Sequence, residues 1–214
     1  MYKDIIILSS SFKHDGRCIA GIDAETGDWI RLYSSNLATE GAVPLNQLIY
    51  ENGSMVSIYD VVRVNLTMSC PTLVQPENWH YDESEKWELI RKSNLHEVIH
   101  LHGFDRPKTI FKNTENKLPG DTVFDSEPSL LLIKLVSPEV FIKTFDSKKV
   151  QLCFTYNGDE YRYFKITDIE INNKYSDHPD GGIRLNGIIP AVFSLTDKYK
   201  LSGKYYKVVA QILE

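Results

Sequence analysis

Short runs of β-branched and aromatic residues, separated by turn residues, recur along the whole chain. Within residues 60–67, Val62, Val64 and Leu66 occupy every second position, and this period of two predicts a strand with one buried face. The same criterion predicts strands over residues 4–9, 17–23, 29–33, 60–67, 129–136, 140–145, 149–156, 160–166, 187–195 and 205–213. A mainly β chain with about ten short strands is typical of two small barrels or a sandwich.

Turn residues indicate how some of these strands are connected. Ala24-Glu-Thr-Gly-Asp28 predicts a hairpin between residues 17–23 and 29–33. Asn157-Gly158 predicts a second hairpin, because both residues tolerate a positive φ. The four runs between residues 129 and 166 follow one another closely, so we expect them to form a meander.

The middle of the chain has a different pattern. Residues 83–92 carry acidic side chains early and basic side chains late, which predicts one short helix. Residues 94–128 are rich in His, Gly, Pro and Asn, and such a long irregular stretch favours a functional or connecting segment. We therefore expect a first barrel with a helical and loop insertion over residues 1–125, and a second barrel over residues 126–214.

Composition sets limits on location and partners. Hydrophobic residues make up 42% and charged residues 25%, as in an ordinary globular protein. The three cysteines, Cys18, Cys70 and Cys153, lie far apart and suit reduced thiols in a cytoplasm. The apolar run near the N-terminus is too short for a membrane span. We expect a cytoplasmic protein with no membrane partner and no cofactor. A net charge of −5 opposes unspecific attraction to phosphates, although a local basic face can coexist with it.

Several segments carry a family resemblance. They are Ser11–Asp23, Gly27–Ser34, Gln75–Trp79, Phe154–Asp168, Ser194–Thr196 and Lys204–Leu213. In this order they resemble the dual-OB-containing domain family, which is found in many bacteria. The resemblance implies two OB-like barrels in tandem and a presumed role in nucleic-acid binding, with no known catalytic residues. One departure is Leu32, which stands where the family pattern has proline.

Candidate binding residues combine aromatic and basic side chains. Trp29 and Arg31 are two positions apart on a predicted strand, so they share one face on which a base could stack and a phosphate could bind. Trp29 equally fits the core, because large aromatic residues are usually buried. Asn78 and Trp79 lie in a predicted loop, where they could contact a base or plug an interface. The full set predicted to bind single-stranded DNA or RNA is Lys13, Arg17, Trp29, Arg31, Asn78, Trp79, Arg162, Tyr205 and Lys207.

Two other classes of function remain open. His96-Glu-Val-Ile-His100 fits the H-E-x-x-H pattern of zinc hydrolases, but Gly103 and Pro107 leave room for a short helix only. The net negative charge favours a domain that binds a protein or a small ligand. The leading hypothesis is a module without catalytic activity that binds nucleic acid. The alternative partner is a protein, and the sequence does not determine the oligomeric state.

Overall fold

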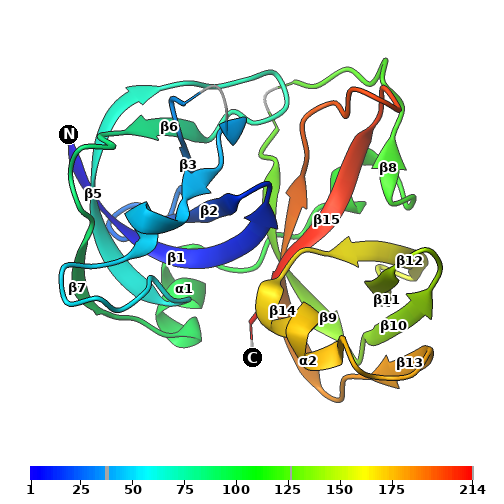
Figure 1. The fold of residues 1–214 in the computed structure, drawn as a ribbon. Helices are drawn as coiled ribbons and strands as arrows, with labels where there is room; N and C mark the ends of the chain where they lie inside the picture. Colours follow the sequence, from blue (N-terminus) through cyan, green and yellow to red (C-terminus); the bar gives the residue numbers. More distant parts are fainter. Residues whose placement is uncertain (37–38, 126, 214) are drawn as a thin grey trace. The chain divides into compact units, whose positions relative to one another are not determined.

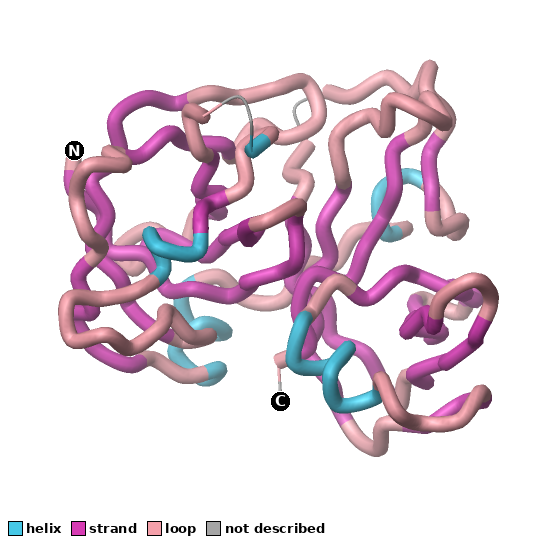
Figure 2. The backbone as a smooth tube through the Cα atoms, in the orientation of Figure 1, coloured by secondary structure: helices cyan, strands magenta, loops and turns pink. Residues whose placement is uncertain are grey.

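The protein is described by a computed structural model that covers residues 1–36, 39–125 and 127–213 (Figure 1). Strands make up most of the backbone, and the helices are short (Figure 2). The chain divides into two compact units, Met1–Gly103 (unit 1) and Phe104–Glu214 (unit 2). This boundary precedes the one expected after residue 125, because the connecting segment belongs to unit 2. For example, the Asp105 N–H donates to the Leu132 carbonyl over 2.9 Å.

Unit 1 contains a closed barrel. Its strands are β1 (Tyr2–Lys13), β2 (Gly16–Asp23), β3 (Trp29–Tyr33), β5 (Asp60–Ser69) and β6 (Asn78–Tyr81). They pair in the order β1-β2-β3-β6-β5, and β5 pairs back with β1. The β3–β6 pair is parallel and the others are antiparallel. This is the five-stranded barrel of the OB fold.

Alternating side chains fill this first barrel. Ile5, Ile19, Leu32 and Val62 belong to one buried cluster, which also includes Trp87. Burying side chains of this size contributes about 1.5–3 kcal/mol each. Around the barrel lie β4 (Val43–Pro44), the 3-10 helix η2 (Leu45–Leu48), β7 (Glu88–Lys92) and α1 (Leu95–Leu101).

Unit 2 repeats the connectivity of unit 1. Its main strands are β9 (Leu130–Val136), β10 (Glu139–Thr144), β11 (Lys148–Tyr156), β12 (Asp159–Ile166), β14 (Ile188–Leu195) and β15 (Tyr205–Ile212). They lie in the order β10-β11-β12-β15-β14-β9, and the β12–β15 pair is parallel, like β3–β6. The remaining elements are η3 (Ile110–Lys112), β8 (Lys117–Leu118), α2 (Ile169–Tyr175) and β13 (Gly181–Arg184). The tandem OB fold expected from the resemblance is therefore confirmed.

The first barrel strand of unit 2 is broken into two. Only residues 137 and 138 separate β9 from β10, yet β9 pairs with β14 and β10 pairs with β11. Together these two strands make the pairings that β1 makes alone in unit 1. The expected four-strand meander is therefore wrong at its first step, since β9 does not pair with β10, and β10, β11 and β12 form the rest of it.

Both expected hairpins are confirmed. Strands β2 and β3 are antiparallel neighbours, with Ile19 opposite Leu32. Strands β11 and β12 are joined by Asn157 and Gly158, whose φ angles are 52° and 88°. The residues chosen for turn chemistry thus adopt the left-handed conformation that a tight hairpin requires.

The helix expected over residues 83–92 is wrong. Residues 88–92 form β7, which pairs with β5. Pairing with a buried strand outweighs the charge pattern there, because a local dipole effect contributes only about 0.3–1 kcal/mol. The helix of this region is α1, which begins after Asn94, whose side chain accepts from the Glu97 N–H. Helix α2 was not predicted; it begins after Asp168.

Candidate nucleic-acid interface

The predicted residue Arg31 lies inside unit 1 and not on its surface. Only 3% of it is exposed, and its guanidinium contacts the Glu77 carboxylate at 2.9 Å. Its other terminal nitrogen lies 3.4 Å from the Cys18 sulfur. Because the pair is buried and mutually satisfied, Arg31 connects β3 to the segment before β6. It presents no free charge to a phosphate.

Trp29 and Asn78 also make internal contacts. The Trp29 ring meets the His102 ring edge-on at 5.0 Å, just beyond the end of α1. The Asn78 amide is fully buried and donates to the Gln75 side chain over 3.2 Å. Trp79 pairs with Leu32 across the parallel β3–β6 pair, is partly buried, and packs against the core cluster. These three positions therefore support the barrel.

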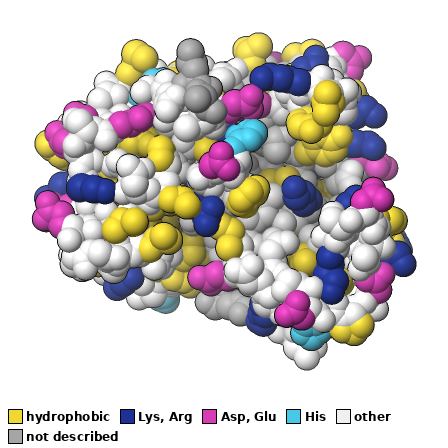
Figure 3. All heavy atoms as spheres, in the orientation of Figure 1, with side chains coloured by type: hydrophobic (Ala, Val, Ile, Leu, Met, Phe, Trp, Pro, Cys, Tyr) yellow, Lys and Arg dark blue, Asp and Glu magenta, His cyan; other side chains and the backbone are white. Residues whose placement is uncertain are grey.

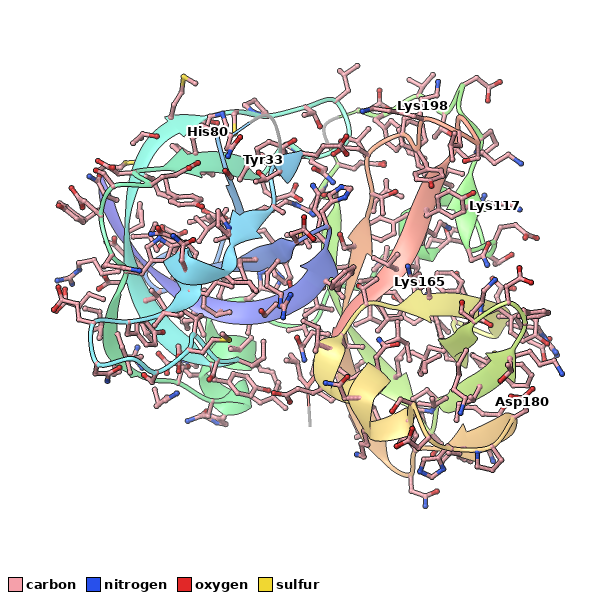
Figure 4. All side chains as sticks on the ribbon, in the orientation of Figure 1. Tyr33, His80, Lys117, Lys165, Asp180 and Lys198 are labelled. Atoms are coloured by element: carbon pink, nitrogen blue, oxygen red, sulfur yellow. The ribbon has the colours of Figure 1, made fainter. Side chains whose placement is uncertain are left out.

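A smaller cluster of unit 1 stays partly exposed. The Lys13 ammonium lies 5.3 Å from the Tyr33 ring centre, and the Tyr33 and His80 rings are 5.9 Å apart. Figure 4 shows Tyr33 and His80 on neighbouring strands. Arg17 is half-buried, and its guanidinium donates to the Gly16 carbonyl over 3.0 Å. Lys13 and Arg17 thus stay candidates for ligand contact.

Charge is distributed unequally between the units. Residues 1–103 contain 8 Lys and Arg against 14 Asp and Glu, a net charge of −6. Residues 104–214 contain 16 against 15, a net charge of +1. A polyanion is therefore repelled less by unit 2. In Figure 3, dark blue Lys and Arg side chains are spread over the visible face of both units.

The outer face of the unit 2 sheet aligns aromatic and basic side chains. Phe141 of β10 lies opposite Gln151 of β11, which lies opposite Lys165 of β12. Each of these residues stands between two buried neighbours, so all three point outward. Lys165 in turn pairs with Val208 of β15. The row therefore crosses four strands.

Tyr163 adds a second ring to this row. Its φ of 61° departs from strand geometry, and it is 41% exposed, next to exposed Arg162. Its ring meets the Phe141 ring at 5.1 Å. Its carbonyl accepts from the side-chain amides of Gln151 and Asn116, each over 3.1 Å. The backbone at Tyr163 is thus held in place with the ring on the surface.

The face continues to β15 and β8. Tyr206 of β15 pairs with Lys117 of β8, and both are at least partly exposed. Within the described part of the chain, neither Lys117 nor Lys165 has a carboxylate at ion-pair distance. Figure 4 labels Lys117, which belongs to β8, and Lys165, which belongs to β12. We call the set Lys117, Phe141, Gln151, Tyr163, Lys165 and Tyr206 the aromatic–lysine face.

The comparison with known families agrees with this architecture. A family model described as the dual OB-containing domain matches residues 3–212. The chain belongs to the dual OB-containing domain family. Searches of curated proteins and of solved structures gave no match. No helix in the described ranges of this dual-OB chain is long and apolar enough to cross a membrane.

Two of the predicted unit 2 residues lie away from the face of the dual-OB chain. Lys207 is 1% exposed, and its ammonium donates to the carbonyls of Ile110 and Asn113 and to the Asn113 side chain over 2.6–2.7 Å. Burial lowers the pKa of Lys207 to about 7. Tyr205 is partly buried, with its ring 5.0 Å from that of Phe124.

The third predicted residue of unit 2, Arg162, lies on the surface beside the aromatic–lysine face. It is exposed and forms an ion pair with Glu160 at 2.8 Å. Its neighbours Tyr163 and Lys165, together with Phe141 and Lys117, were missed. The signal was present, since Phe141 and Lys165 each stand between two apolar residues. It was not decisive, because ordinary solvent-facing strand positions have the same pattern.

The H-E-x-x-H segment of the dual-OB chain is arranged as a surface helix and not as a metal centre. Glu97 accepts from Arg91 over 2.8 Å and from the Ser93 hydroxyl over 2.7 Å. These hydrogen bonds, Arg91 foremost, lower the pKa of Glu97 to about 2, which makes it a poor general base. Among the residues that the structure describes, no three His, Cys, Asp or Glu side chains are grouped to hold a metal ion.

Proposed function

We propose that the protein binds single-stranded nucleic acid on the aromatic–lysine face of unit 2. The observation that carries the proposal is the alignment of Phe141 on β10 with Tyr163 and Lys165 on β12, across the intervening β11. In the unit 2 barrel, β11 and β12 take the second and third positions, and in OB folds these strands carry the oligonucleotide-binding face.

The chemistry of this face suits a single strand. Stacking of a base on an aromatic ring contributes about 1–3 kcal/mol and tolerates any base, because every base has a π-face. The rings of Tyr163 and Phe141, which meet edge-to-face, provide aromatic surface for such stacking. Lys117 and Lys165 provide cations for the phosphates, and Gln151 lies between Phe141 and Lys165. Such a face favours binding with little dependence on sequence.

The test is fluorescence anisotropy of labelled single-stranded DNA and RNA of about 15 nucleotides, which fits one OB fold. Tyr163→Ala should weaken binding about 5- to 100-fold through lost stacking. Lys165→Ala should weaken it less and should lower the dependence on salt, because one phosphate contact is lost.

Two control variants are matched to these changes. Lys134 is an exposed lysine between buried residues of β9, and Phe12 is a 61% exposed aromatic residue of β1. Lys134→Ala and Phe12→Ala should both bind as the wild type does. The proposal fails if no oligonucleotide binds at micromolar protein and low salt, or if Tyr163→Ala and Lys165→Ala bind normally.

A second candidate function concerns unit 1. Its net charge of −6 and the burial of Trp29, Arg31 and Asn78 favour binding of a protein or a small ligand over a nucleic acid there. If the whole chain bound no oligonucleotide, this function would become the leading one.

The cytoplasm is the proposed compartment. Cys18, Cys70 and Cys153 are all free and partly buried, which supports a reducing compartment. Burial raises the pKa of Cys70 and of Cys153, which keeps both in the thiol form. Fractionation of the native host, with the protein detected by antibody, would show whether it stays in the soluble cytoplasmic fraction.

A further inference from the structure

The connection between β14 and β15 ends in an exposed leucine. Leu201 is 87% exposed, more than any other large hydrophobic residue that the structure describes. It lies in a turn over residues 200–203, which an antiparallel bridge between Tyr199 and Lys204 closes. We call residues 196–204 the β14–β15 hairpin. Figure 1 shows it at the start of β15, close to β8.

The backbone of this hairpin is held firmly. The Tyr199 N–H donates to the Lys204 carbonyl, and the Gly203 N–H donates to the Tyr199 carbonyl, each over 2.8 Å. At its base, the Thr196 N–H donates to the Tyr206 carbonyl over 2.9 Å. These hydrogen bonds define the turn that presents Leu201 to solvent.

The hairpin is also anchored from the side. The Lys198 ammonium donates to the Gly120 carbonyl over 2.8 Å. A Cβ atom at Gly120 would lie 2.0 Å from the Gly203 carbonyl oxygen, so the two backbones are in close contact there. The Tyr206 hydroxyl donates to the Ser202 hydroxyl over 3.1 Å.

Basic side chains surround the apolar tip. Lys198, Lys200 and Lys204 are all exposed, and Asp197 is the one acidic residue of the hairpin. Figure 4 shows Lys198 near the start of β15. An apolar side chain flanked by cations suits a ligand with anionic groups outside and flat apolar groups inside. Nucleic acids have this arrangement, and apolar residues such as leucine insert between their base steps.

The hairpin is continuous with the aromatic–lysine face. The Tyr199 ring lies 6.1 Å from the Tyr206 ring, and Tyr206 pairs with Lys117. A strand that leaves the hairpin would therefore reach the face directly. We propose that the β14–β15 hairpin is a wedge that opens the last base pair where a duplex meets a single strand, with Leu201 as the inserted residue. This inference rests on the proposed function.

The test compares two ligands with the full chain. One is a single strand of about 15 nucleotides, and the other is the same strand extended by a short duplex, with 2-aminopurine in the base pair at the junction. Wild type should bind the junction about tenfold more tightly, and 2-aminopurine fluorescence should rise as its stacking is lost. Leu201→Ser should lose both effects and still bind the single strand within about twofold of wild type.

The matched control is Leu73→Ser, at an 81% exposed leucine of unit 1. It should keep the junction preference. The wedge is wrong if wild type binds single strands through Tyr163 and Lys165 but shows no junction preference, and the proposed function then stands. If single strands do not bind, the proposed function is wrong, and the wedge, which rests on it, is overturned as well. Absence of binding to both ligands overturns both.

A membrane surface is the competing partner for a basic hairpin with an apolar tip. Vesicles that contain phosphatidylserine provide the anionic groups without bases. The wedge is overturned if such vesicles bind wild type, Leu201→Ser loses that binding, and junctions leave 2-aminopurine unchanged. It is also overturned if Leu201→Ser opens the junction as well as wild type does.

Discussion

Arg31 and Glu77 show at the residue scale why charge alone does not identify a binding site. Both side chains are about 95% buried, and their contact of 2.9 Å joins β3 to the segment before β6. A buried ion pair of this kind gives little net stability, but the loss of one partner leaves an uncompensated charge in the core. Arg31 therefore matters for folding whether or not a ligand binds.

The first prediction follows from this pair. Glu77→Gln should lower the free energy of unfolding by about 3–5 kcal/mol, because the Arg31 charge then lacks its counter-ion. Urea denaturation measures the change. The control is Asp4→Asn, which breaks the partly exposed Arg63–Asp4 pair and should cost less than about 1 kcal/mol. Equal effects of the two variants would contradict the role assigned to Arg31.

Residue patterns predicted the faces of strands but not what covers them. Trp29 and Arg31 share a face, as their spacing predicts, yet that face is buried. Phe141 and Lys165 show the same kind of alternation and are partly or fully exposed. The difference depends on distant segments that pack over each strand, such as the end of α1 over Trp29. No local pattern contains that information.

At the scale of elements, the strands were predicted well because their signal is local. Each long strand that the sequence predicted is present, with ends shifted by a few residues. The short strands β4, β6, β7, β8 and β13 were missed. A run of two to four residues has too few positions to show a period of two, and at five-residue β7 the charge pattern predicted a helix instead. Partners elsewhere in the chain determine whether such runs pair.

Lys207 of β15 binds the segment that leads into the missed strand β8. Its ammonium donates to carbonyls within residues 110–113, and β8 then pairs with β15 at Tyr205 and Tyr206. Phe111 and Lys112 both have a positive φ in this segment, 49° and 68°. Such conformations cost about 1–2 kcal/mol per residue, so the segment needs contacts of this kind to keep its shape.

The second prediction uses the titration of Lys207. Its pKa is about 7 in the folded protein and near 10.5 when the chain is unfolded. Between these values the unfolded state binds more protons, so this group makes the free energy of unfolding increase as pH rises. From about pH 7 to pH 9 the increase should be about 2 kcal/mol.

Urea denaturation at the two pH values measures the effect. Lys207→Met removes the titrating amine, and it should be less stable because the Ile110 and Asn113 oxygens lose a donor. It should also lack this part of the pH dependence, although the other titrating groups are unchanged. The assignment is wrong if both proteins gain equally in stability as pH rises.

At the scale of the whole molecule, two copies of one topology carry different surfaces. Each unit has one parallel strand pair and the same strand order, but their net charges are −6 and +1. The family resemblance predicted the repeated fold, because it depends on segments along nearly the entire chain. It did not predict the proposed division of roles, which depends on a few exposed side chains.

The third prediction tests that division in the intact chain. The double variant Lys117→Ala/Lys165→Ala should weaken oligonucleotide binding about tenfold. It should also reduce the slope of log affinity against log salt by about 1.4, because each phosphate contact on a single strand contributes about 0.7. Lys13→Ala with Arg17→Ala changes the same number of cations in unit 1. If unit 2 holds the strand, that pair should change affinity less than about twofold and leave the slope unaltered. A larger effect of the Lys13 and Arg17 pair would place the strand on unit 1, where Tyr33 and His80 would supply the stacking surface, and it would reverse the assignment of the two barrels.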